Sequence, residues 1–270
     1  MSSDLVARAY DLALLQTAAN YDLNVTEERK ASNLWLVDLY GRLVQAIRPR
    51  LVLELGAFSA AFSRSQRAGL PESQFHAFEA NPYNYQRFRP LVEEAGVHYH
   101  HRAIGETVGA CTFKLARKRA GQDLQPTKGN NSLRTKPLDI EYEDISVKMT
   151  TVDHFVRKQG LADLTTAMWI DLEGCAYEAL GAAARTLRNT RLILIELEDQ
   201  PFWIGQKLSA DVRGLLAAAG FVPLARDFEY RGQYNMIFVA LETYDHPEVR
   251  AILANSLSQA GRRVRAAPPA

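Results

Sequence analysis

The stretch that decides the fold is Arg50-Leu51-Val52-Leu53-Glu54-Leu55-Gly56-Ala57-Phe58-Ser59. Its apolar run, Leu51 to Leu53, lies between a proline and Gly56, which predicts a short buried strand that ends in a tight turn. A helix is expected over residues 59–67, with Ser59 as its N-cap. A strand, a glycine turn and a helix place backbone N–H groups at the carboxyl edge of a parallel sheet, where doubly wound folds bind nucleotide-like ligands. We therefore expect the ligand pocket at this turn.

A second strand is expected at Gln74-Phe75-His76-Ala77-Phe78-Glu79, and it ends in an acidic residue. Glu79 follows Glu54 by 25 residues (79 − 54 = 25). Folds of this kind hold a ribose diol with a carboxylate at the end of the second strand, roughly 20 residues after the glycine turn. Asn81-Pro82 then begins another helix, with the proline in its first turn. The two units together predict an adenosine-bearing cofactor.

The bulk composition is typical of a globular protein, since 47% of the 270 residues are hydrophobic and 23% are charged. The length fits one main α/β domain.

No apolar run reaches the length of about 18 residues that spans a bilayer, and no signal peptide is recognised, so we expect a cytoplasmic protein. The formal net charge of +1 gives no global attraction to nucleic acid or to an anionic membrane. The two cysteines lack the spacing of a zinc site, which favours a reducing compartment.

Three segments are expected along the chain. Residues 1–48 should form an N-terminal helical cover, whose competing role is contact within a homo-oligomer. Residues 49–245 should form the main domain, and residues 246–270 a final helix and a flexible tail. Further strands are expected over residues 98–104, 110–115, 147–151, 165–170, 191–197, 221–225 and 235–241. The last two strands resemble a hairpin, which would place an antiparallel strand at the end of an otherwise parallel sheet.

The segment from Arg117 to Pro137 is expected to be a loop, because glycines, prolines and asparagines interrupt every hydrophobic period in it. A loop of about 20 residues in a compact domain is uncommon unless it is a lid, a binding loop or a disordered stretch. It could fold over the substrate and offer the uncharged groups of Asn130, Asn131 and Ser132. A mobile surface loop is the competing interpretation.

Acidic residues follow two of the expected central strands. Asp171-Leu172-Glu173-Gly174 comes directly after the strand over residues 165–170, and the next strand ends in Glu196, Glu198 and Asp199. Carboxylates at the carboxyl end of a central strand are costly to bury without a function. We therefore treat them as candidates for the chemistry.

His98, His100 and His101 invite a metal interpretation. His98 and His100 share one face of the expected strand, however, while His101 points to the other face. No carboxylate pattern completes a metal site there, so an ordinary polar strand is favoured.

With these segments placed, four motifs carry a resemblance to a known family. They are Leu53-Glu54-Leu55-Gly56-Ala57, Ala77-Phe78-Glu79-Ala80-Asn81-Pro82, Thr150-Thr151-Val152-Asp153 and Trp169-Ile170-Asp171-Leu172-Glu173-Gly174. In these motifs the chain resembles the FkbM-type methyltransferases, a family of S-adenosylmethionine-dependent O-methyltransferases with the class I, Rossmann-like methyltransferase fold. The resemblance runs from about Leu51 to Leu197.

The chain departs from the family pattern at four positions. Glu54 stands where the family usually has aspartate, Phe58 replaces an asparagine, Ala60 replaces a glycine and Ala176 replaces a glutamate. The methyl group of Ala60 limits how closely the backbone can approach the methionine part of the cofactor.

The resemblance implies a mostly parallel seven-stranded sheet with helices on both faces and an N-terminal helical extension. It implies S-adenosyl-L-methionine as cofactor, with Glu54 facing the methionine ammonium, Glu79 binding the ribose hydroxyls and Ile104 forming an apolar wall at the adenine. Gly56 and Ala57 would lend backbone donors to the methionine carboxylate. The full set of expected cofactor-binding residues is Glu54, Gly56, Ala57, Ser59, Glu79, Ala80, Asn81, Ala103, Ile104 and Asp171. For each acidic residue, a helix cap or a surface ion pair is the structural alternative.

Methyl transfer from a sulfonium to a hydroxyl is an in-line displacement, so the acceptor oxygen must be aligned with the methyl group and lose its proton. A hydroxyl is a poor acid, so a general base or a metal ion is expected. Asp171 and Glu173 are the first candidates for catalysis, with His154 as an alternative base. A magnesium ion held by Asp171, Glu196 and Glu198 is a further alternative, since Mg²⁺ prefers oxygen ligands.

The sequence therefore predicts an S-adenosylmethionine-dependent O-methyltransferase that acts in biosynthesis on a hydroxyl of a small molecule, a sugar or a natural-product intermediate. The alternative is a degenerate methyltransferase-like domain that binds a partner without catalysis, which the altered turn at Phe58 and Ala60 favours. A nicotinamide-dependent oxidoreductase is disfavoured because no Gly-x-Gly-x-x-Gly motif occurs at the turn.

Overall fold

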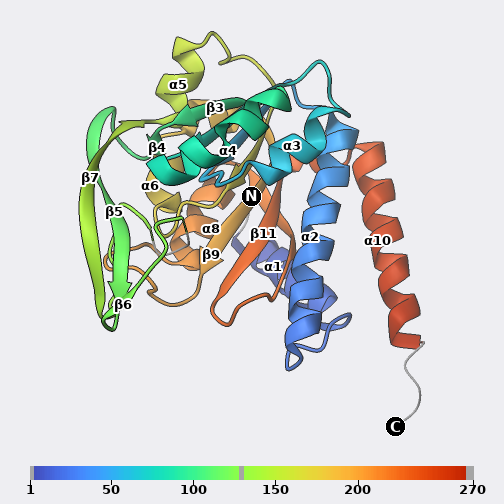
Figure 1. Cartoon of the computed structure of the whole chain (residues 1–270). Helices are drawn as coiled ribbons and strands as arrows, with labels where there is room; N and C mark the ends of the chain where they lie inside the picture. The colour runs from blue at the N-terminus through green and yellow to red at the C-terminus, as the bar shows by residue number, and fades with distance from the viewer. Residues whose placement is uncertain (1–2, 128–130, 266–270) are drawn as a thin grey trace.

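The computed structural model describes residues 3–127 and 131–265, and Figure 1 shows its elements. The helices are α1 (Ser3–Ala18), α2 (Thr26–Ile47), α3 (Ala61–Arg67), α4 (Pro82–Glu94), α5 (Val152–Lys158), α6 (Ala176–Gly181), α7 (Ala184–Asn189), α8 (Ser209–Ala218), α9 (Leu241–Tyr244) and α10 (Pro247–Arg265). The strands are β1 (Leu51–Leu55), β2 (Gln74–Glu79), β3 (His98–His101), β4 (Ala103–Ile104), β5 (Gly109–Arg119), β6 (Gln122–Asp123), β7 (Ile140–Thr150), β8 (Thr166–Ile170), β9 (Thr190–Glu198), β10 (Phe221–Arg226) and β11 (Gln233–Ala240).

Seven strands form the central sheet, in the order β10-β11-β9-β8-β1-β2-β3. β1 pairs in parallel with β2 and β8, while β3 and β9 continue the parallel part on either side. β11 is antiparallel to β9, and β10 is antiparallel to β11. The predicted seven-stranded sheet, mostly parallel with an antiparallel end, is confirmed.

The register of the central strands brings three predicted site residues to one edge. Leu55 is aligned with Phe78 on β2 and with Ile170 on β8. The next residue along each strand direction is therefore Gly56, Glu79 or Asp171. Because the carboxyl ends of parallel strands meet at the same edge of a sheet, these residues lie side by side.

The sheet is covered on both faces, as predicted. Along β1 the side chains of Leu53 and Leu55 join an apolar cluster with α5, α6 and α8, while Val52 joins a second cluster with α2 and α3. Both faces of β1 are therefore buried, which accounts for its apolar run from Leu51 to Leu53. The two N-terminal helices cover opposite faces, since α1 contributes Ala13 to the first cluster and α2 packs into the second. Figure 1 shows α2 lying beside α10.

A second sheet, with the strand order β4-β7-β5-β6, was not predicted. The expected strand over residues 98–104 divides between the two sheets, because β3 belongs to the first and β4 to the second. The expected loop from residue 117 is wrong in its first part, since β5 continues to Arg119 and β6 follows. The Nζ of Lys114 lies 2.7 Å from Asp144 across the β5–β7 pair. Figure 1 shows this hairpin at the end of the molecule opposite α2 and α10.

Several helix boundaries also differ from those predicted. α3 begins at Ala61, and Ala60 rather than Ser59 is its N-cap residue, without a side-chain hydrogen bond. α10 continues to Arg265, and the last five residues of the expected tail lie outside the described residues. Within the described parts of the chain, no helix is long and apolar enough to cross a membrane.

Candidate active site

The turn between β1 and α3 is held by an unusual backbone. Gly56 has φ +79°, and a Cβ on it would lie 1.6 Å from the carbonyl oxygen of Asp171, so only glycine fits. Phe58 and Ala60 also adopt left-handed conformations, with φ of 48° and 49°. The Gly56 and Ala57 N–H groups both donate to the Phe78 carbonyl oxygen, at 3.1 and 2.8 Å. The turn is therefore fixed to β2 and to the end of β8.

Glu79 closes β2 and is tied into the same turn. Its Oε2 accepts the N–H of Phe58 at 2.8 Å, and its Oε1 accepts the N–H of Asn81 at 2.6 Å. Burial raises the pKa of Glu79 to about 7, and the two backbone N–H groups act in the opposite direction. A carboxylate has about four lone-pair sites, so Glu79 can still accept two hydrogen bonds from a ligand.

Four further carboxyl groups follow β8 and close β9. Burial raises the pKa of Asp171 to about 6, and a hydrogen bond with Glu196 lowers it. Burial and the neighbouring Asp171 charge raise the pKa of Glu173 to about 8. Burial likewise raises the pKa of Glu198 to about 7 and that of Glu196 well above its ordinary value. Like charges so close together cannot all be ionised, so part of this group holds protons near neutral pH.

A cavity of about 560 Å³ opens at this edge of the sheet. Its volume lies in the range of about 300–1,000 Å³ that is usual for small-molecule sites. The predicted site residues that line it are Gly56, Glu79, Ala80, Asn81, Ala103, Ile104, Asp171 and Glu173. The cavity therefore contacts the ends of β1, β2 and β8 together with β4.

In a comparison with protein families, residues 43–223 match the family described as Methyltransferase FkbM domain. The chain belongs to the FkbM methyltransferase family. The match covers more than half of the chain, and the four motifs above lie within it. A comparison with the curated proteins found no match.

Several solved structures are similar to the chain at low sequence identity. The chain is similar to the methyltransferase FkbM from Methylobacillus flagellatus KT, with 12% identity and a TM-score of 0.45, over 71% of this chain and 44% of that one. It is also similar to the O-methyltransferase from Bacillus cereus in complex with SAH, with 12% identity and a TM-score of 0.41, over 86% of this chain and 90% of that one. The chain thus spans less than half the length of the Methylobacillus relative.

In this member of the FkbM methyltransferase family, Glu54 lies beneath the turn and is not among the residues that line the cavity. Its side chain is 4% exposed, and Oε2 accepts the N–H of Ser63 at 2.8 Å. Burial raises the pKa of Glu54 to about 7. A carboxylate at the first turn of α3 is a favourable helix cap, so it takes the place that was predicted for Ser59. Contact of Glu54 with the methionine ammonium stays a prediction.

Two other predicted cofactor residues also lie off the cavity wall. Ala57 and Ser59 are not among its lining residues. Because the Gly56 and Ala57 N–H groups already donate to Phe78, a ligand carboxylate could use them only by sharing these hydrogen bonds. Their predicted role as donors therefore remains a prediction.

His154, the alternative base, lies on α5 and not at the cavity wall. Its N–H is bonded to the Thr151 hydroxyl at 3.0 Å, and its ring Nδ1 lies 3.5 Å from the Arg157 guanidinium. This arrangement caps and closes the first turn of a helix. A substrate in the described cavity would not be expected to reach this imidazole directly.

Two of the three histidines of β3, His98 and His100, stack on His76 of β2, whereas His101 stacks on Tyr85. The His76 ring lies 4.7 Å from that of His98 and 5.3 Å from that of His100, and His76 Nδ1 is 3.0 Å from His100 Nε2. Burial and the neighbouring imidazoles lower the pKa of His76 to about 3 and of His100 to about 4. We call His76, His98 and His100 the histidine stack.

The proposed magnesium site does not fit the arrangement found. Among the side chains that the structure describes, no group of three or more His, Cys, Asp or Glu residues could hold a metal ion. Glu196 and Glu198 are also absent from the cavity wall, while Asp171 lines it. No step of the chemistry is therefore assigned to a metal.

Sequence reasoning left open whether the segment after β6 lies over the substrate or is a mobile surface loop, and it did not predict the contacts that its side chains make. Asn131 and Ser132 line the cavity, whereas Asn130 lies outside the described residues. The Asn131 amide accepts the N–H of Ala116 at 2.9 Å and donates to the carbonyl oxygen of Pro126 at 3.1 Å, so it mainly braces its own segment. The Ser132 hydroxyl donates to the carbonyl oxygen of Glu173 at 2.7 Å.

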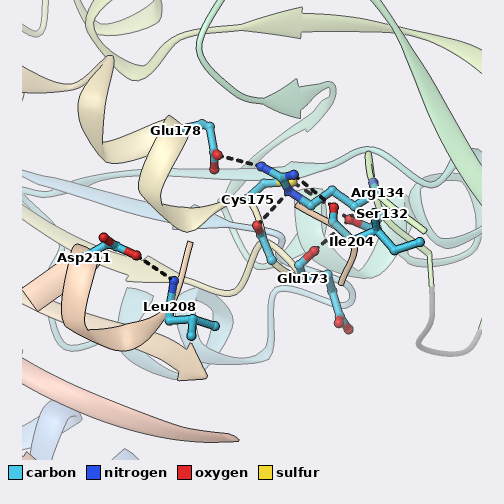
Figure 2. Close-up of polar contacts among 9 residues, drawn as sticks. Ser132, Arg134, Glu173, Cys175, Glu178, Ile204, Leu208 and Asp211 are labelled. Atoms are coloured by element: carbon cyan, nitrogen blue, oxygen red, sulfur yellow. Dashed lines mark hydrogen bonds and ion pairs between the residues drawn. The ribbon is translucent and has the colours of Figure 1, made fainter. Parts of the chain in front are cut away.

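Arg134 was not predicted at all, although it contacts the same turn. Figure 2 shows its guanidinium between the Glu178 carboxylate and the backbone that follows Glu173. No spacing rule reveals such a residue, because its partners include two backbone carbonyl oxygens.

Proposed function

We propose that this FkbM methyltransferase transfers the methyl group of S-adenosylmethionine to a hydroxyl group of a small molecule, of the sugar or natural-product class. The observation that supports this most is the common cavity of Glu79, Asp171 and Glu173, beside the Gly56 turn. One carboxylate at the end of β2 and a separate acidic group after β8 are suited to bind the cofactor and the acceptor, respectively.

The residues of the chain fit the proposed cofactor. Glu79 would accept both ribose hydroxyls, since each of its oxygens uses one lone pair on a backbone N–H. Ala103 and Ile104, buried at 4% and 2% exposure, would form the apolar border of the adenine. When bound, the cofactor supplies an electrophilic methyl group on a positively charged sulfur.

The carboxyl groups after β8 would then act on the acceptor hydroxyl. A C–O bond forms between the acceptor oxygen and the methyl carbon while the C–S bond breaks, and the hydroxyl proton passes to a carboxylate. Glu173 suits this role because burial and Asp171 raise its pKa to about 8, and a base works best with a pKa near the working pH. Asp171 also lines the cavity and is the second candidate.

Calorimetry with S-adenosylmethionine and its demethylated product SAH tests the cofactor assignment first. We expect saturable binding of both, and the absence of heat together with the absence of a thermal shift would reject the proposal. A panel of sugar and natural-product hydroxyl acceptors, followed by SAH release, then tests transfer. Binding of the cofactor with no release on any acceptor would favour the alternative of a non-catalytic binding domain, which the left-handed Phe58 and Ala60 also allow.

A further inference from the structure

The turn that carries Glu173 is strained and needs support. We define the β8–α6 turn as residues 171–175. Within it Glu173 has φ +46° and Gly174 has φ +83°. Glycine adopts such a conformation freely, but for glutamate it is unfavourable, and residues held in this way cluster at functional sites. Contacts from elsewhere in the fold must therefore stabilise the conformation of Glu173.

One side of the turn is closed by a buried tryptophan. Trp203 is fully buried, and a Cβ on Gly174 would lie 2.6 Å from its ring. The turn cannot move toward this side without displacing a close-packed aromatic ring. Any relaxation of the turn must take place on the other side, toward the segment that we call the strap, residues 131–136.

Arg134 of the strap holds that other side. Its Nε donates to the carbonyl oxygen of Gly174 at 3.0 Å, and its Nη2 pairs with Glu178 at 2.6 Å. Its Nη1 donates to the carbonyl oxygen of Ile204 at 3.2 Å, and the N–H of Ile204 returns to the strap at Thr135. Figure 2 shows these contacts converging on one guanidinium.

The Ser132 hydroxyl adds a contact to the neighbouring carbonyl oxygen. Ser132 is 2% exposed, and its Oγ donates to Glu173 at 2.7 Å and accepts the N–H of Arg134 at 3.1 Å. The two carbonyl oxygens of the strained pair, those of Glu173 and Gly174, are thus both held by strap side chains. A planar guanidinium can reach three acceptors in fixed directions, which a lysine ammonium on a flexible stem cannot reproduce.

We propose that Arg134 is a positioning residue that fixes the β8–α6 turn so that the Glu173 carboxylate faces the sulfonium group of the bound methyl donor. This inference rests on the proposed function, because it assigns the sulfur of the cofactor to the cavity beside Glu173 and Asp171. Its consequence is that the second sheet, through the strap, takes part in building the active site.

The test separates positioning from general support by comparing two ligands that differ in charge. S-adenosylmethionine carries a positive sulfur, whereas SAH carries a neutral thioether. The affinities of the full chain for both are measured by calorimetry at pH 8 for the wild type, Arg134→Lys, Glu173→Gln and the double variant. Arg191→Lys is the matched control, because Arg191 also forms an ion pair, with Glu242, but lies at the start of β9.

We expect Arg134→Lys to weaken the binding of S-adenosylmethionine roughly tenfold, the size of one charge-assisted contact, and that of SAH less than about twofold. Glu173→Gln should show the same preference. If Arg134 acts through Glu173, the double variant should bind no more weakly than Glu173→Gln alone. Arg191→Lys should leave both affinities unchanged.

Equal losses for the two ligands, additive losses in the double variant, or no loss in Arg134→Lys would each overturn the inference while leaving the proposed function standing. Wild-type protein that binds neither ligand would overturn the proposed function and the inference with it. If Arg134→Lys does not fold, Glu178→Gln removes the ion pair that anchors the guanidinium. Glu178→Gln should also weaken the binding of S-adenosylmethionine more than that of SAH. Equal affinity changes for the two ligands would count against the inference.

Discussion

Replacing Glu79 with glutamine probes the proposed ribose site, and its effect can be worked out from the contacts of this side chain. Both oxygens of Glu79 accept backbone N–H groups, from Phe58 at 2.8 Å and from Asn81 at 2.6 Å. A glutamine amide offers only one acceptor oxygen, so one of these N–H groups would face another donor. Leaving such a buried group unpaired costs about 1–3 kcal/mol of folding free energy. Glu79→Gln should therefore be destabilised by about this amount in urea unfolding.

The effect of Glu79→Gln on SAH binding should be of similar size. The loss of a charge-assisted hydrogen bond to the ribose diol costs about 1.5–3 kcal/mol, or roughly 10- to 150-fold in Kd. The wild-type affinity should also depend on pH, because burial raises the pKa of Glu79 to about 7 and the hydroxyls donate to the ionised form. Binding at pH 6 should be about tenfold weaker than at pH 8.

Calorimetric titrations of SAH across this pH range measure both effects, with Glu72→Gln as the control, because Glu72 is exposed and precedes β2, at the other end of the strand from Glu79. In Glu79→Gln the contribution of Glu79 to the pH dependence should vanish. The ribose assignment would be refuted if the variant bound SAH within about twofold of the control, or if it retained the full wild-type pH dependence.

The remaining predictions concern stability. Gly56→Ala should cost at least about 3 kcal/mol in urea unfolding, because its Cβ would lie 1.6 Å from a backbone oxygen; a loss below 1 kcal/mol would contradict this close approach. The free energy of unfolding of Ala60→Gly should stay within about 1 kcal/mol of the wild-type value. Glycine relieves the left-handed conformation, which is worth about 1–2 kcal/mol, but the variant loses a buried methyl group and has a more flexible unfolded chain. The melting temperature should fall from pH 6.5 to pH 8.5. In the folded chain the pKa values of Glu79 and Glu173 are about 7 and 8, above their ordinary 4.5. The folded chain therefore binds more protons than the unfolded chain in this range, and its stability decreases as the pH rises. A melting temperature that rises over this range would contradict the prediction. The range begins at pH 6.5 because the lowered pKa values in the histidine stack make the stability increase with pH below it.

The central sheet could be predicted because each of its strands carries a local signal. The apolar run Leu51 to Leu53 and the acidic end of the strand at Glu79 are legible in the order of residues alone. Their alignment follows from the rule that parallel strands end at one edge. The position of Asp171 beside Gly56 was therefore within reach of the sequence.

The second sheet was out of reach because its pairing is non-local. The partner of Lys114 is Asp144, and between them lie the glycines and prolines that suggested a loop. Whether such breakers interrupt a segment or only join its strands depends on contacts far apart in the chain. The role of Glu54 was equally open, because a carboxylate after a strand can bind a ligand or cap the helix that follows, and only packing separates the two.

The crystal structure of the full chain with SAH bound would test the proposed active site most directly. We predict that both ribose hydroxyls lie about 2.6–3.2 Å from the oxygens of Glu79, and that the sulfur faces Asp171 and Glu173. A nucleoside bound away from Glu79, or a sulfur that points out of the cavity and away from the β8–α6 turn, would contradict it.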